Sequence, residues 1–266
     1  MTALTQEVSL TNIQEKLPSS GTDARRSRME DIYAILSGDD STERACTDIP
    51  PAECTNLPRN YVLNVLNGAA SKLAEQVASA KFVLPWLLGA LGTPTFFVGL
   101  LLPLRQTGSL LPQLAVAGRI RRYPVRKWFW VVSAMVQVLI LLAMIAAAVM
   151  LPPPAAGVCI VAGLIVFSIC RGVGSVAFQD VTGKTIPKGR RGKLLAARGM
   201  IGGLLTIVVG LAIKAASGDN TAMRPALVLL FGGAILWLIA GLAFAGMTES
   251  PGAVSGGRNA LREALA

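Results

Sequence analysis

The sequence predicts an all-α integral membrane protein with six transmembrane helices. Of the 266 residues, 53% are hydrophobic and only 15% are charged, whereas about a quarter of the residues in a soluble domain carry charge. The charges gather in a few clusters, and long apolar runs fill the chain between Tyr61 and Met247. A water-soluble fold cannot bury about five or six uninterrupted apolar segments of this length, so we expect them to lie in lipid.

Residues 1–59 differ in composition from the rest of the chain. They are charged like ordinary soluble sequence, and they are too few to form a domain with a core of its own. They also lack the apolar stretch behind a basic cap that defines a signal peptide. We expect a polar, partly disordered cytoplasmic tail. Within it, RRSRMEDIYAIL fits a short amphipathic helix on the membrane surface, and disorder up to Asp31 is the alternative.

The expected membrane domain covers residues 60–248. Four of its helices are clear, because each contains the roughly 20 apolar residues that cross a hydrocarbon core of about 30 Å. They are residues 128–151, 155–178, 199–217 and 225–247. Between residues 61 and 118 the apolar run alone favours one span over residues 82–104. Glycine followed closely by proline at residues 92–94 is a turn signal, and it gives two helices instead, at residues 62–89 and 95–117.

The basic clusters decide in favour of the two-helix interpretation. With a turn at residues 92–94, the clusters at residues 119–127 and 184–193 fall on the same side of the membrane as the tail. In membrane proteins the cytoplasmic loops are the ones enriched in Lys and Arg. The sequence therefore predicts six spans in the cell membrane with both termini in the cytoplasm. Residues 249–266 then begin a cytoplasmic linker or tail.

The composition gives no support to several other classes of function. The net charge of +10 is typical of nucleic-acid binding, but the basic clusters lie only a few residues from apolar spans and fit a role in topology. The chain has no histidine, and its four cysteines lack metal-ligand spacing. Neither a nucleotide fingerprint nor a nucleophile–base arrangement is present. We expect the lipid bilayer as a partner, and we expect no nucleic acid, no enzymatic activity, no metal and no cofactor.

Three of the expected helices carry polar residues on one face. At 100° per residue, the polar residues of the first helix fall within an arc of about 140°, and those of the fourth within about 80°. Ionisable residues inside a membrane are costly and mark functional sites by default, so we expect these faces to line a shared central cavity. The candidate substrate or coupling pathway consists of Asn64, Asn67, Ser71, Lys72, Glu75, Arg105, Gln113, Arg171 and Ser175.

Glu75 is the one acidic residue embedded in the expected spans away from a boundary. Burial and a nearby arginine act on such a carboxylate in opposite directions, which suits proton coupling. One alternative is a purely structural ion pair of Glu75 with a basic residue in the spans. The basic residues within reach of such a pair are Lys72, Arg105 and Arg171. In the other alternative, Arg105 and Arg171 bind an anionic group of the substrate.

Asp180 lies at the cytoplasmic end of the fourth helix. In one interpretation it is a solvated boundary acid. In the other it belongs to a latch, pairing with loop arginines such as Arg122 or Arg191 in one conformation and releasing them in another. The candidate latch consists of Arg122, Arg126, Asp180 and Arg191.

Several segments follow the order of a known helical fold. FVLPWLLGALGTPTFFVGLLLPLRQTGSLLPQL has the pattern of a helix, a short outer turn and a second helix, and a basic loop follows it. Arg171 lies in the fourth helix, a basic Gly/Pro loop precedes a glycine-rich fifth helix, and TESPGAVSGGRNALREALA has the composition of a linker. In these features, the stretch from about residue 60 to 250 resembles the amino-terminal six-helix half of a major facilitator superfamily transporter.

The family's loop motif after helix two, Gly-x-x-x-Asp-Arg-x-Gly-Arg-Arg/Lys, is matched in part. Arg122 falls on its first arginine and Arg126 on its last basic position. The first glycine, the aspartate, the second glycine and one arginine are replaced by Ala117, Arg121, Pro124 and Val125. The fifth helix also lacks the Gly-Pro signature of drug/proton antiporters, which argues against that subclass.

The resemblance implies secondary-active transport of a small solute by alternating access, with ion or proton coupling as an option. The solute is not specified by the sequence. Family members normally carry twelve spans in two related halves. A chain with six implies a half-length transporter that pairs with itself or with a separate chain, or else a truncated product. The alternative class is a non-transporting membrane subunit or a remnant of a twelve-helix transporter.

Overall fold

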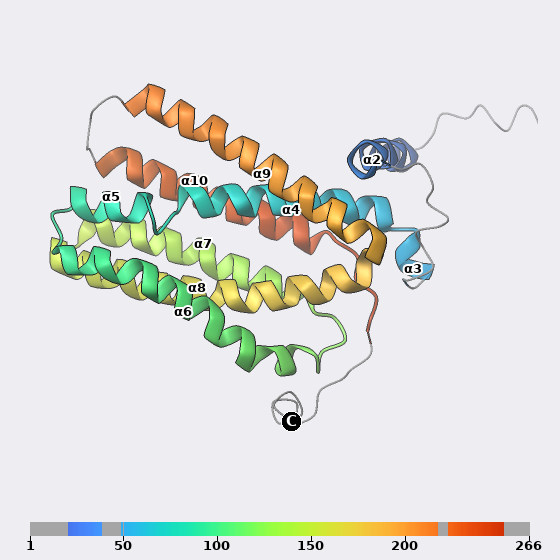
Figure 1. Cartoon of the computed structure of the whole chain (residues 1–266), viewed down its shortest axis with the longest axis horizontal. Coiled ribbons are helices and arrows are strands. Elements are labelled where there is room, and N and C mark those ends of the chain that lie inside the picture. The colour runs from blue at the N-terminus through green and yellow to red at the C-terminus, as the bar shows by residue number, and fades with distance from the viewer. Residues whose placement is uncertain (1–20, 39–48, 50, 218–222, 253–266) are drawn as a thin grey trace, which may run out of the picture.

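The computed structural model describes residues 21–38, 49, 51–217 and 223–252, and all regular secondary structure in these ranges is helical (Figure 1). The all-α class is therefore confirmed for this part of the chain. The helices are α2 (Gly21–Ser37), α3 (Pro51–Cys54), α4 (Leu57–Val77), α5 (Val83–Ala90), α6 (Thr95–Ile120), α7 (Lys127–Met150), α8 (Pro153–Thr185), α9 (Lys188–Ser217) and α10 (Met223–Ala245).

Within the described residues, four helices are long and apolar enough to cross a membrane, namely α7, α8, α10 and the segment Lys188–Leu211 of α9. This fits a multi-pass membrane protein. α8 and α9 are longer than the expected segments 155–178 and 199–217, because their polar ends continue the helix beyond the apolar run. Hydropathy detects only the part of a helix that is apolar enough for lipid, and so it underestimates both lengths.

The helix expected over residues 62–89 is interrupted. α4 ends at Val77 and α5 begins at Val83. Pro85 explains the break, since in a continuous helix its ring would clash with the carbonyl of Lys81 and it has no N–H to donate. In the break, the hydroxyl of Ser79 accepts a hydrogen bond from the backbone N–H of Lys81 at 3.1 Å.

The chain reverses direction between α5 and α6, where the sequence predicts a turn. Gly92 has a φ of 69°, a backbone conformation that glycine adopts without steric cost. The hydroxyl of Thr93 donates to the carbonyl of Leu88 at 2.9 Å, and Pro94 directly precedes α6. These contacts hold α5 and α6 as an antiparallel pair.

The connections between helices separate to two ends of the bundle (Figure 1). The α5–α6 and α7–α8 connections lie at one end, whereas α2, α3, the α6–α7 connection and the α8–α9 junction lie at the other. The basic clusters at residues 119–127 and 184–193 belong to these last two connections. Both clusters therefore lie at the same end of the bundle as the amino-terminal helix α2.

The helices form two arms, α9–α4–α10 and α6–α8–α7, which pack together along α7 and α10 (Figure 1). The most extensive interfaces are α7–α8, α6–α8, α7–α10, α4–α10 and α4–α9. Exchanging α4, α6 and α7 with α8, α9 and α10, respectively, returns the same set of interfaces. The bundle therefore has an internal repeat of three helices in its packing.

Glycines permit close approach in each arm. α6 meets α8 at Gly108, where an added Cβ would lie 2.9 Å from the Cβ of Ser168, and α9 meets α4 at Gly202, where it would lie 2.7 Å from the Cβ of Lys72. The partner helices contribute Gly172 and Gly68, which face Ser109 and Arg198. Small residues at helix interfaces allow such contacts in membranes. The two arms thus use equivalent contacts.

The amino-terminal helix α2 packs on the ends of α4 and α9. Tyr33 is 2% exposed, and its ring makes an edge-to-face contact with the ring of Tyr61 at 5.2 Å between centroids. The guanidinium of Arg190 also lies over the ring of Tyr33, at 5.1 Å from its centroid. RRSRMEDIYAIL thus lies within a helix that contacts the bundle through Tyr33. Residues 1–20 lie outside the described part of the chain.

Candidate functional site

A cavity of about 190 Å³ lies between the two arms, with walls from α4, α7, α8, α9 and α10. Its polar lining includes five residues of the pathway that the sequence predicts. These are Ser71, Lys72, Glu75, Arg171 and Ser175. Ser71 and Ser175 belong to matching segments of the two central helices, Gly68-Ala-Ala-Ser71 in α4 and Gly172-Val-Gly-Ser175 in α8.

An ion pair between Glu75 and Arg171 joins α4 to α8 across this cavity. The side chain of Glu75 is 13% exposed and that of Arg171 is 39% exposed, so the guanidinium retains access to the cavity. Of the three basic residues that sequence reasoning left open as partners, the structure pairs Arg171. Lys72 is exposed, and Arg105 interacts with Glu75 and Arg171 only at longer range.

Arg198 is the charged residue of this cavity that the sequence did not predict. Its guanidinium donates to the side-chain oxygens of Asn64 and Asn67, the latter at 3.2 Å, and lies 4.0 Å from the centroid of the Phe178 ring. Asn64 and Asn67 are fully buried. They therefore position the guanidinium of Arg198 by hydrogen bonds and do not line the cavity.

The second expected helix, α6, contributes less to the cavity than the sequence predicts. Arg105 and Gln113 belong to α6, and neither lines the cavity. α6 packs on the outer side of α8, and its place around the cavity is taken by α7, α9 and α10. Polar residues at helical spacing show that a helix has a polar face, but the spacing does not show which neighbouring helix covers that face.

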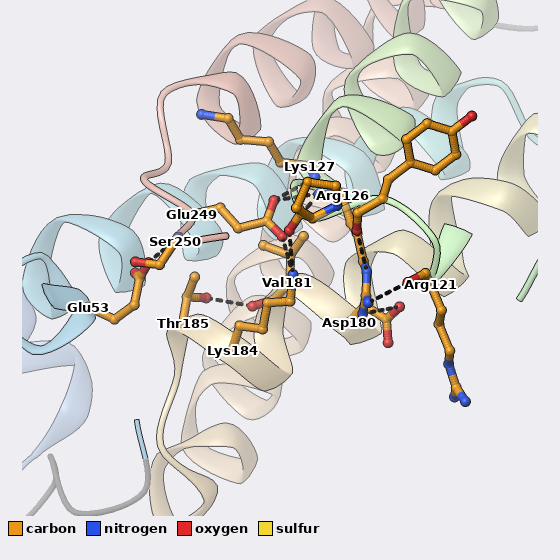
Figure 2. Close-up of polar contacts among 12 residues, drawn as sticks. Glu53, Arg121, Arg126, Lys127, Asp180, Val181, Lys184, Thr185, Glu249 and Ser250 are labelled. Carbon is orange, nitrogen blue, oxygen red and sulfur yellow. Dashed lines mark hydrogen bonds and ion pairs between the residues drawn. The ribbon is translucent and has the colours of Figure 1, made fainter. Parts of the chain in front are cut away.

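At the end of the bundle that carries the basic clusters, Asp180 of α8 forms an ion pair with Arg126, at 3.2 Å (Figure 2). The guanidinium of Arg126 also donates to the carbonyl oxygens of Tyr123 and Arg121, each at 3.1 Å. Arg126 is 6% exposed. The ion pair therefore fixes the α6–α7 connection on α8.

The other two arginines of the predicted latch are elsewhere. Arg191 donates to the carbonyl oxygens of Ile186 and Gly183, at 3.0 and 2.6 Å, and so stabilises the α8–α9 junction. Arg122 is exposed. In this conformation the partner of Asp180 is Arg126, and the pairs with Arg122 and Arg191 are not formed.

Glu249, just after α10, binds three groups from the α6–α7 connection, α7 and α8 (Figure 2). Its carboxylate accepts hydrogen bonds from the backbone N–H groups of Arg126 and Lys127, at 2.9 and 2.7 Å, and forms an ion pair with Lys184 at 2.8 Å. The side chain is 0% exposed. A carboxylate is well suited to the amino-terminal end of a helix, here α7, because the N–H groups there lack partners within the helix.

Glu53 of α3 makes a second attachment of the same segment. It is 1% exposed, and it accepts hydrogen bonds from the side chain of Asn60 at 3.2 Å and from the backbone N–H of Ser250. The side chain of Asn60 in turn bonds both the N–H and the carbonyl of Thr248, each at 3.0 Å. Residues 248–250 are thus fixed between α3, α4, α7 and α8, and we call them the clasp.

Comparison of the chain with family models, with curated proteins and with solved structures finds no match. Within residues 21–38, 49, 51–217 and 223–252, no cluster of three or more His, Cys, Asp or Glu side chains could hold a metal ion. The function proposed below is therefore based on the geometry of the site.

Proposed function

We propose that this chain is a six-span bundle of the major-facilitator type that moves a small solute across a cell membrane by alternating access. α4 with α5 would form the first span and α6 the second, followed by α7, α8, α9 and α10. The observation that carries the proposal is a polar cavity between two arms of equivalent packing, with an ion pair joining the arms.

The internal repeat supports this assignment. Each six-helix half of a major facilitator transporter consists of two repeats of three helices that are related by an axis in the membrane plane, and transporter substrate sites lie where repeats meet. Here the exchange of three helices for three preserves the main interfaces, and the cavity lies between the exchanged central helices α4 and α8.

The Glu75–Arg171 pair supplies a means of coupling transport to protons. It connects one central helix to the other, so its making and breaking bear on the relative position of the two arms. Protonation of Glu75 removes the negative charge and weakens the attraction. Ionisable groups that face each other inside a membrane are a common element of proton relays.

The end of the bundle with the basic clusters and α2 is proposed to face the cytoplasm, in accord with the positive-inside rule. The Asp180–Arg126 pair and the clasp then close the cytoplasmic end in this conformation. Opening toward the cytoplasm requires these contacts to separate. They form the latch of the proposed cycle. This latch consists of the Asp180–Arg126 pair and the contacts of Glu249, and it does not include the predicted Arg122 and Arg191.

A second six-helix unit is proposed as a partner. Only 17% of the most apolar stretch of α9 is buried, against 44% for the corresponding stretches of α7, α8 and α10. α6 and α9 are equivalent under the exchange of helices and form the outer edges of the two arms. A second unit that packs on these edges would cover the uncovered face of α9 and complete the wall of the pathway.

Reconstitution tests the proposal directly. Purified protein in sealed lipid vesicles is given labelled alanine, glucose, lactate or choline, with and without an inward proton gradient. We expect protein-dependent accumulation of at least one of these solutes, and we expect it to disappear in Glu75→Gln. Folded protein that accumulates none of the four solutes under either condition would contradict transport.

A further inference from the structure

The charges around the cavity do not balance. Lys72, Arg171 and Arg198 line it, and Arg105 interacts with the same ion pair at longer range. Against these four basic side chains stands the carboxylate of Glu75, which is already paired with Arg171. The cavity therefore carries an excess of positive charge.

Arg198 accounts for much of this excess. Among the residues that the structure describes, no carboxylate lies within ion-pair distance of it, and its hydrogen-bond partners are the neutral amide oxygens of Asn64 and Asn67. Arg198 also lies close enough to Arg171 for the two to repel each other. Like charges that are held close together cost energy. An anion in the cavity would reduce this cost for both arginines.

Two buried polar atoms of residues that line the cavity also lack partners. The side-chain oxygen of Gln137 and the indole N–H of Trp237 make no hydrogen bond, although Gln137 is 1% exposed and Trp237 is 2% exposed. Both residues line the same cavity. Most buried polar atoms in proteins are paired. One acceptor and one donor without partners are what a ligand hydroxyl, which both donates and accepts, would satisfy.

We infer that the cavity binds a small organic anion that carries a hydroxyl group, an inference that rests on the proposed transport function and specifies its substrate class. Arg171 and Arg198 bind the oxyanion, because guanidinium groups match the geometry of carboxylate and phosphate oxygens. Gln137 and Trp237 bind the hydroxyl. The cavity of about 190 Å³ has room for a short hydroxycarboxylate.

Tryptophan fluorescence tests the inference without requiring transport, because Trp130 and Trp237 both line the cavity. Lactate, propionate, glycerol and ethanolamine are titrated into the detergent-solubilised full chain. We expect a saturable change with lactate, a weaker one with propionate, which lacks the hydroxyl, and none with neutral glycerol or cationic ethanolamine.

Variants identify the residues that bind the anion. Arg198→Gln is expected to weaken lactate binding at least tenfold, and Arg198→Lys to weaken it less, since it retains the charge. Gln137→Leu is expected to reduce the preference for lactate over propionate, since only the Trp237 contact to the hydroxyl remains. Arg119→Gln is the matched control, because it removes the same charge from an exposed site on α6, and binding should be unchanged. Circular dichroism establishes that each variant is folded.

The outcomes separate this inference from the proposed function. If lactate and propionate leave the fluorescence unchanged, or if folded Arg198→Gln binds lactate as tightly as the unmodified chain, the anion site is wrong even where vesicles accumulate another solute. If lactate binds in the predicted manner but no labelled solute enters vesicles, the site stands and the proposed transport is contradicted.

Discussion

Neutralising either member of the Glu75–Arg171 pair is expected to abolish solute accumulation and to lower stability, and neutralising both is expected to cost less stability than either single change. In Glu75→Gln, Arg171 loses its partner while Arg198 and Arg105 still repel it. In Arg171→Gln, the carboxylate of Glu75 is left beneath the surface at 13% exposure. Removing one partner of a fully buried pair costs about 3–5 kcal/mol. We expect about 1–3 kcal/mol here, because Arg171 is partly exposed.

The double change Glu75→Gln with Arg171→Gln removes both charges together, so neither is left without its partner. Thermal unfolding in detergent should give a melting temperature above that of both single variants, and the coupling in a double-mutant cycle should exceed about 0.5 kcal/mol. Lys81→Gln, which removes an exposed charge just after α4, is the control and should change neither stability nor transport. A double variant no more stable than the worse single one would show that the two residues do not act as a pair.

Replacing Glu249 with glutamine is expected to destabilise the protein by about 2–4 kcal/mol, since a fully buried carboxylate has three donors around it. The amide of glutamine presents N–H groups where the backbone of α7 and Lys184 also donate, so at least one contact becomes repulsive. The α6–α7 connection and the clasp should then separate. If the clasp closes the cytoplasmic end, limited proteolysis should cut this connection faster in Glu249→Gln.

Asp31→Asn is the matched control for Glu249→Gln, because Asp31 is an exposed acid on α2. Its melting temperature and its proteolysis rate should equal those of the unmodified chain. The account of the clasp is contradicted if Glu249→Gln melts at the same temperature as Asp31→Asn, or if the loop at residues 121–126 is cut no faster than in the control.

Local patterns in the sequence predicted the helices and the turn at residues 92–94, since apolar length and the Gly–Pro signal act over short distances. They also predicted the polar face of α4, which reaches the cavity through Ser71, Lys72 and Glu75. The break before α5 was missed, although Pro85 is a local signal for it. The six-span count itself remains a proposal.

Contacts between distant segments could not be predicted in this way. Glu249 and Glu53 bind groups from the α6–α7 connection, α7, α8, α4 and the clasp, and no spacing in the sequence indicates these partners. Arg198 precedes an apolar run, and hydropathy therefore assigned it to a loop. The extension of α9 to Lys188 brings Arg198 onto a helix face, one turn before the interface glycine Gly202. The four-residue spacing between Arg198 and Gly202 is the sequence signal that could have placed Arg198 on this helix face.

The most direct test of the six-span account is the side of the membrane on which the α6–α7 connection lies. A short epitope tag is inserted in the full chain after Val125, and in separate variants after Gly92 and after Pro152, and antibody binding is compared in intact and permeabilised cells. We predict that the tag after Val125 binds antibody only after permeabilisation, whereas the other two bind in intact cells. A tag after Val125 that is accessible in intact cells would contradict the six-span count, the proposed orientation and the assignment of the latch.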